Sequence, residues 1–107
     1  MSRGGLPSDF FDRLSPKKEA LLQVLLDADV EWMEGPRVRQ QMRDQYDLSI
    51  PDKSGAIASH QGHFTQRYSK QFSRDVINVK WANKSRGIAK YRIGDTYRDE
   101  LDNYFNR

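Results

Sequence analysis

The sequence has no cysteine among its 107 residues, which excludes disulfide bonds and thiolate metal sites. It also has no long apolar run. The longest, residues 20–26, is interrupted by Gln23 and is far shorter than the roughly 20 residues that span a membrane. Residues 1–7 lack the apolar core of a secretory signal. These absences predict a soluble, cytoplasmic protein.

The signatures of several enzyme classes are also missing. There is no glycine-rich phosphate loop and no Gly-x-Ser-x-Gly turn. His60 and His63 have the spacing to touch one ion from a helix, but no cysteine, third histidine or nearby acid completes a zinc site. We therefore expect no catalytic activity, no metal and no cofactor.

What the sequence does have is a strong separation of charge. The net charge is only +3, yet the stretch from Lys53 to Arg92 holds nine lysines and arginines against one acid, Asp75. The rest of the chain holds nine basic and fourteen acidic residues. A basic region almost free of acids favours an anionic partner over simple solvation of the surface.

A helix is predicted within this basic region, over residues 59–72. At about 100° per residue, one stripe of the helix is largely apolar and consists of Ile57, Gln61, Phe64, Tyr68 and Phe72. The opposite arc is polar and basic, and it consists of Ser59, His63, Gln66, Arg67, Lys70 and Arg74. Such a helix docks on a core with one face and leaves the other for phosphates and base edges.

A β-hairpin is predicted after the helix, from two alternating runs at residues 76–81 and 88–93. The runs are joined by a polar loop that ends in Gly87, and period two on both sides of such a loop is typical of a hairpin. We expect Trp81 and Tyr91 to be at least half buried, and Lys80, Lys90 and Arg92 to face outward. A flexible tip would carry Lys84 and Arg86.

The rest of the chain predicts elements on both sides of this region. Residues 1–7 should be mobile, and a short helix capped by Ser8 should follow. Ser15-Pro16 signals the start of a helix that runs to about residue 28. We further predict a short strand over residues 30–33, a helix over residues 36–46, and a last helix capped by Gly94-Asp95. One domain, residues 8–107, is expected to hold all these elements.

This order predicts an α+β fold of the winged helix-turn-helix type. It has a three-helix core, an antiparallel β-hairpin wing, and additional N- and C-terminal helices. More narrowly, the chain resembles the N-terminal winged-helix domains of Mrr-type restriction endonucleases. The similarity lies in residues 21–26, the Leu48-Ser49-Ile50-Pro51 loop, the helix 60–72, and residues 87–93 before a polar helix start. The resemblance implies DNA targeting but not cleavage, because the nuclease domain of those enzymes has no counterpart here.

We expect this chain to bind double-stranded DNA, as a regulator-like or DNA-targeting module. The predicted helix would lie in the major groove, and the basic wing would contact the backbone or the minor groove. The candidate base-edge contacts are Ser59, His63, Gln66 and Arg67. The candidate phosphate contacts are Lys53, Lys70, Arg74, Lys80 and Lys90, with Lys84 and Arg86 at the wing tip.

Two alternatives stay open at this point. The apolar stripe of the last helix (Tyr97, Leu101, Tyr104 and Phe105) suits a homodimer or a partner domain, so the chain could be a protein-interaction module. Within this stripe we expect Tyr97 and Leu101 to be buried against the first helix of the same chain, and Tyr104 and Phe105 to be the residues that meet another molecule. RNA binding is the other alternative. Trp32, Trp81 and Tyr91 could stack on bases, but the hairpin register favours the core for Trp81 and Tyr91.

Overall fold

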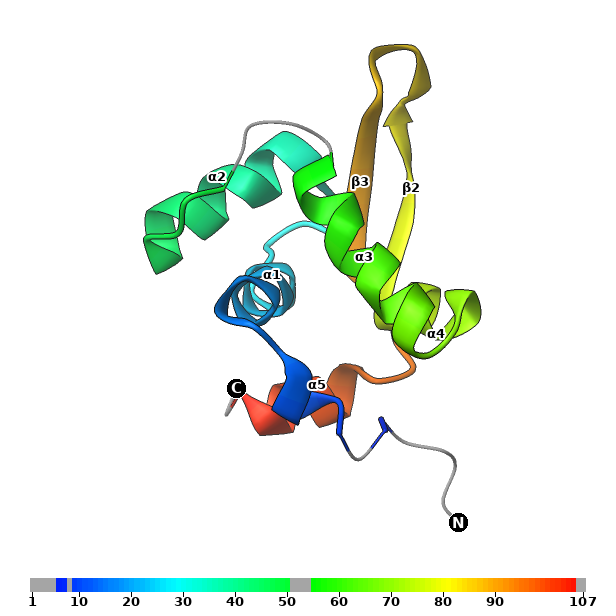
Figure 1. Ribbon diagram of the computed structural model, residues 1–107. Coiled ribbons are helices and arrows are strands. Elements are labelled where there is room, and N and C mark those ends of the chain that lie inside the picture. Colours follow the sequence, from blue (N-terminus) through cyan, green and yellow to red (C-terminus); the bar gives the residue numbers. More distant parts are fainter. Residues whose placement is uncertain (1–5, 8, 51–54, 106–107) are drawn as a thin grey trace.

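The computed structural model describes residues 6–7, 9–50 and 55–105. In these residues the chain forms an α+β arrangement of helices on a three-stranded antiparallel sheet, as the sequence predicts (Figure 1). In chain order the elements are η1 (Phe11–Arg13), α1 (Pro16–Leu26), β1 (Met33–Glu34), α2 (Gly35–Tyr46), α3 (Gly55–Arg67), α4 (Lys70–Val76), β2 (Ile77–Asn83), η2 (Lys84–Arg86), β3 (Ile88–Ile93) and α5 (Arg98–Tyr104).

Helix α1 is the centre of the core, and its start agrees with the prediction. Ser15 is its N-cap: Ser15 Oγ accepts a hydrogen bond from Lys18 N at 3.3 Å, and Pro16 is the first helical residue. This arrangement satisfies a donor of the first turn that otherwise has no partner. Leu21, Leu22 and Val24 on this helix are completely buried.

The sheet has the order β1-β3-β2, so the last strand in sequence is the central one. Tyr91 on β3 lies opposite Val79 on β2 and opposite Met33 on β1. The predicted hairpin is therefore confirmed. The predicted strand over residues 30–33 was displaced: β1 contains only Met33 and Glu34, and Val30 is exposed.

The hairpin loses its cover toward the tip. Figure 1 shows β2 and β3 extending beyond the helices, with α3 crossing in front of their lower part. Ile77, Ile93 and Tyr91 are buried, Tyr91 being 4% exposed as expected, but Trp81 is 54% exposed. The prediction that Trp81 is at least half buried was wrong, because the inward face of a strand is buried only where another element covers it. The tip itself has regular structure: Lys84–Arg86 form η2, and Gly87 follows with a φ of 69°.

The basic helix predicted over residues 59–72 is two helices. Helix α3 ends at Arg67, and Ser69 then caps α4 with extended backbone and with Oγ accepting from Phe72 N at 3.0 Å. The prediction of one continuous helix was wrong. It rested on the helical spacing of Phe64, Tyr68 and Phe72, and this spacing continues across the break. Val76, assigned to the first strand from its alternation, is the last residue of α4.

The two ends of the described chain pack against each other. Leu6 N donates to a carboxylate oxygen of Glu100 at 3.1 Å, and Phe10 is buried among Phe64 and Phe72 of α3 and α4. Ser8, the predicted cap, and residues 1–5 lie outside the described residues, and the short helix after Ser8 is η1. Of the segment predicted to be mobile, residues 6 and 7 are half buried.

The last helix begins later than the sequence indicates. Asp95 does not cap it: one oxygen of Asp95 accepts from Arg92 Nη2 at 3.0 Å, and α5 starts at Arg98. Leu101 of α5 is completely buried, and the ring of Tyr97 lies 5.4 Å from the ring of Phe72. Gly94 marks a close approach of two backbone segments, since a Cβ there would collide with the carbonyl oxygen of Asp75.

Within the described ranges, no helix combines the length and the apolar character that crossing a membrane requires.

Candidate nucleic-acid interface

Helix α3 presents an outward crest of small and polar side chains. Ile57, His60 and Phe64 are buried, and the opposite side of the helix carries Ser59 and Gln66, both exposed. Gly62 lies between these two on the crest, with no neighbour within 4 Å of where its Cβ would be. The helix contains no acidic residue. The crest is therefore free to meet another molecule closely.

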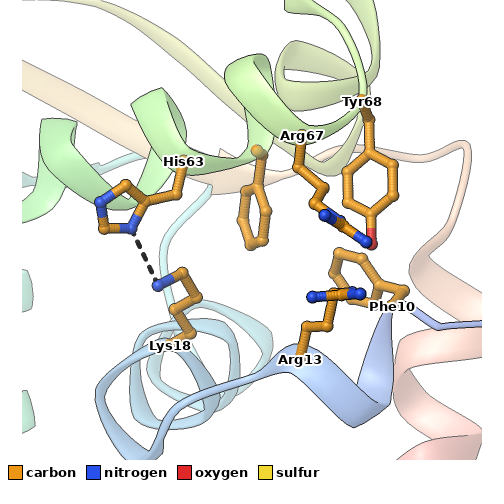
Figure 2. A pocket seen from close by; sticks show the side chains of 7 residues that line it. Phe10, Arg13, Lys18, His63, Arg67 and Tyr68 are labelled. Carbon is orange, nitrogen blue, oxygen red and sulfur yellow. Dashed lines mark hydrogen bonds between the residues drawn. The ribbon is translucent and has the colours of Figure 1, made fainter.

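One flank of α3 carries His63 and Arg67, which face the N-terminal segment and α1 (Figure 2). Lys18 Nζ lies 3.0 Å from Nδ1 of His63. Arg67 Nη2 donates to Asp9 Oδ2 at 3.2 Å, so this predicted base reader is held by an acid from the N-terminal segment. Both residues line a cavity of about 170 Å³, here called the arginine pocket, whose lining residues are Phe10, Arg13, Lys18, His63, Phe64, Arg67 and Tyr68.

The other flank of α3 faces α4 and the hairpin across two adjoining hollows, which we call the hairpin groove. The break after Arg67 moves Lys70 and Arg74 off the α3 crest and into the wall of this groove. A hollow of about 210 Å³ is lined by Gln61, Gly62, Thr65, Lys70, Ser73, Arg74 and Val79. A hollow of about 390 Å³ continues it along Gln61, Arg74, Val79, Lys80, Trp81, Ala89 and Tyr91. The groove is thus basic and ends beside the exposed indole of Trp81.

The outer face of the hairpin gathers three cations around Trp32. The Lys80 ammonium lies 4.4 Å from the centre of the Trp32 ring, Lys90 Nζ lies 6.0 Å from it and the Arg92 guanidinium 5.8 Å. Lys80 and Lys90 are direct cross-strand partners, and like charges in such positions repel each other. The Trp32 ring offsets this repulsion through cation–π attraction.

The predicted contacts therefore lie in four places. Ser59, His63, Gln66 and Arg67 are on α3, Lys70 and Arg74 are in the hairpin groove, Lys80 and Lys90 are at Trp32, and Lys84 and Arg86 are exposed at the tip. At the tip, Asn83 Oδ1 accepts from Arg86 N and from Ser85 Oγ, which fixes the turn. Lys53 lies outside the described residues.

The arginines of α2 are engaged within the chain. Arg39 is only 7% exposed. Arg43 Nη1 donates to Ile50 O at 3.0 Å, and Arg37 Nη2 pairs with Asp29 Oδ1 at 3.2 Å. These contacts leave Arg37, which is half exposed, as the α2 arginine nearest to solvent.

The two histidines have different environments, although they are one helical turn apart. His60 is 8% exposed, and burial, with smaller contributions from the charges of Lys18, His63 and Lys17, lowers the pKa of His60 to about 4. His63 is exposed on the flank of α3. Their rings lie edge to face with centres 6.3 Å apart. Within the described ranges, no three His, Cys, Asp or Glu side chains gather as metal ligands.

Sequence reasoning missed the residues that complete the arginine pocket. Asp9, Arg13 and Lys18 come from the N-terminal segment and α1, outside the basic region that the charge count singled out. Asp9 accepts hydrogen bonds from Arg13 Nε at 2.8 Å, from Arg67 Nη2 and from Tyr68 Oη at 3.1 Å. No short-range pattern in the sequence links these positions.

No protein-family model matches this chain, and no curated protein or solved structure is detectably similar to it.

Proposed function

We propose that this chain is a winged helix-turn-helix module that binds double-stranded DNA. In this proposal α1, α2 and α3 are the three helices of the motif, α3 enters the major groove, and the β2–β3 hairpin is the wing. The element order supports it. The proposal includes the predicted similarity to the N-terminal domains of Mrr-type restriction endonucleases. DNA targeting, as in a transcription regulator, is the corresponding role.

The observation that carries the proposal is the acid-free crest of α3 between two basic flanks. The crest at Ser59, Gly62 and Gln66 has small or slender side chains, so it fits into the major groove of DNA. Gln66 has the donor and the acceptor that pair with adenine. Basic side chains lie on both sides of this crest, with His63 and Arg67 on one flank and Lys70 and Arg74 on the other. Recognition of duplex DNA combines phosphate contacts with side chains that reach the edges of the bases.

The test is a salt titration of duplex binding. If roughly five to seven phosphates are neutralised, log K should fall with log[salt] with a slope of about −5 to −6. Fluorescence anisotropy with a labelled duplex, at several salt concentrations, measures that slope. A flat titration contradicts the proposal and favours a protein partner.

One observation favours a second candidate, the binding of single-stranded nucleic acid, including RNA. Trp81 is 54% exposed at the end of the hairpin groove, close to Arg74 and Lys80. A basic groove with an accessible aromatic ring is suited to stacking an unpaired base. Competition between duplex, single-stranded DNA and RNA for the same protein separates the two candidates.

The protein-interaction alternative has less support from the C-terminal helix than the sequence indicates. Leu101 is completely buried, and Tyr104, although 46% exposed, stacks on Phe11 with ring centres 3.9 Å apart and an interplanar angle of 6°. Phe105 also packs against the core. The stripe predicted to meet another molecule is thus largely occupied within the chain.

A further inference from the structure

The arginine pocket brings basic groups together from three segments that are distant in sequence. Arg13 comes from η1, Lys18 from α1, and His63 and Arg67 from α3. Figure 2 shows the side chains of Lys18 and His63 meeting at one side of the pocket, and those of Arg13 and Arg67 converging near Phe10 at the other. The cavity between them, about 170 Å³, is large enough for a small anion together with water.

The charges of this pocket are not balanced. Arg13, Lys18 and Arg67 are cations, and the acid that contacts them is Asp9. Hydrogen bonds from Arg13 and then Arg67 lower the pKa of Asp9 to about 2, so this carboxylate is ionised at neutral pH. Three positive charges against one negative charge leave an excess of two.

Most of the guanidinium N–H donors in the pocket do not bond to Asp9. It accepts from Nε of Arg13 and from one Nη of Arg67, whereas each guanidinium has five N–H donors. Lys18 has no carboxylate partner within the described part of the chain, and burial lowers its pKa. A half-buried ammonium without a counter-charge is costly, and a bound anion would remove that cost.

The kind of anion follows from the donors. Two guanidinium groups and an ammonium, coming from different directions, suit an anion with oxygens on several sides. His63 positions the ammonium, because Nδ1 of His63 accepts a hydrogen bond from Lys18 Nζ. A planar carboxylate uses two oxygens, as Asp9 does here. A phosphate presents three or four oxygens, and as a dianion it matches the excess charge of the pocket.

We infer that the arginine pocket is a phosphate-binding site, formed by Arg13, Lys18, His63 and Arg67 next to Asp9. The phosphate has two sources, a small phosphorylated ligand or a backbone phosphate of bound DNA. The second source rests on the proposed function, because the pocket opens on the flank of α3 that carries His63 and Arg67. The first source does not.

The first experiment uses the protein alone with inorganic phosphate. Side-chain NMR signals of His63 and the arginines are followed during a phosphate titration at constant ionic strength, with chloride as the balancing anion. We expect saturable shifts that weaken at least about tenfold in Lys18→Gln, since a charged hydrogen bond is lost. Lys17→Gln is the matched control, because Lys17 is the exposed neighbour on the same helix and does not line the pocket.

The outcomes of this titration are decisive in either direction. Saturable binding that needs Lys18 and not Lys17 supports the site. Shifts that rise linearly with phosphate, or that are equal in Lys18→Gln and Lys17→Gln, overturn it. Thermal unfolding of both variants, measured in chloride, checks that each is folded.

The second experiment identifies the source, using a blunt-ended duplex and the same variants. If DNA fills the pocket, inorganic phosphate competes with the duplex, and Lys18→Gln reduces the salt slope by about one. If a small ligand fills it, phosphate binds equally well to the protein saturated with duplex. If the unmodified protein binds no duplex, the proposed function fails, and the first experiment still decides whether the pocket binds phosphate.

Discussion

Arg67 Nη2 lies 3.2 Å from Asp9 Oδ2, although the two residues are 58 positions apart in the sequence. The residue that sequence reasoning selects to read a base is thus held by an internal carboxylate. DNA binding through Arg67 therefore has two possible routes. Either the ion pair opens, or it stays intact while the remaining N–H donors of Arg67 point outward.

We predict that Asp9→Asn tightens duplex binding several-fold. The substitution removes one negative charge beside Arg13 and Arg67 and loosens the hold on Arg67, so the salt slope should steepen by about one. Asp12→Asn is the control, since Asp12 is an exposed acid of η1, whereas the acid paired with Arg67 is Asp9. Equal gains from both variants would indicate a general charge effect and not the release of Arg67.

Arg67 and the wing tip should have different effects on sequence preference. Arg67→Ala is expected to cost about 1–3 kcal/mol on a preferred site and to flatten discrimination among sites. Lys84→Ala combined with Arg86→Ala should weaken all duplexes alike, because phosphate attraction carries no sequence information. Competition against a randomised duplex pool measures both effects. Loss of sequence preference in the wing variant alone would mean that the two roles are reversed.

Trp81 offers a direct test of the second candidate function. Because it is half exposed, Trp81→Ala should change the unfolding free energy little, yet it should weaken single-stranded binding by about 1–3 kcal/mol if a base stacks on it. Duplex affinity should change less. Tyr91→Ala, at the buried cross-strand position, should instead destabilise the fold by several kcal/mol. Unchanged single-stranded affinity in Trp81→Ala would remove the support for stacking.

Two glycines should respond in opposite ways to alanine. Gly94→Ala places a Cβ against the carbonyl oxygen of Asp75 and should cost about 3 kcal/mol or more in unfolding free energy. Gly62→Ala meets no neighbour and should stabilise α3 by up to about 1 kcal/mol. If the α3 crest approaches DNA closely, Gly62→Ala should nevertheless weaken duplex binding. Denaturant unfolding and anisotropy report the two effects separately.

His60 should make the fold less stable in mild acid. Its pKa is about 4 in the folded protein against an ordinary 6.5, so between these values the unfolded chain binds more protons and stability falls as pH falls. The full loss is on the order of 2 kcal/mol after allowance for solvent screening. His60→Leu should abolish the decline between pH 6.5 and 4, whereas His63→Gln should retain it. A decline that persists unchanged in His60→Leu would point to another group.

The sequence predicts the elements that local signals define. Ser15-Pro16 contains both the cap and the first helical residue of α1, and the alternation around Tyr91 defines the strand faces. Ser69 is also a local signal, but the even spacing of Phe64, Tyr68 and Phe72 concealed it. A periodic pattern shows which side chains share a direction, and it does not show whether the backbone between them is continuous.

The features that the sequence did not predict depend on distant parts of the chain. The exposure of Trp81 depends on how far α3 extends along the hairpin, which no property of β2 determines. The contacts that hold Arg67 depend on the docking of Phe10, which places Asp9 beside α3. A count of charges along the sequence therefore identified the basic region and overlooked Asp9, the acid that faces Arg67.

The short strand β1 affects how the hairpin can move. It pairs with β3 only at Tyr91 and Lys90, and Ala89 is the last residue of β3 toward the tip that packs against the core. Beyond Ala89, β2 and β3 pair only with each other. The hairpin is then held at its base by β1 and unsupported at its tip. A load applied at Arg86 would reach the body by two routes. One is β1 and the start of α2, where Gly35 lies close to Ala89 and Tyr91. The other is β2, which follows α4 directly and whose Ile77 carbonyl accepts a hydrogen bond from Gln61 of α3. Bending of the hairpin is thereby coupled to the position of α3.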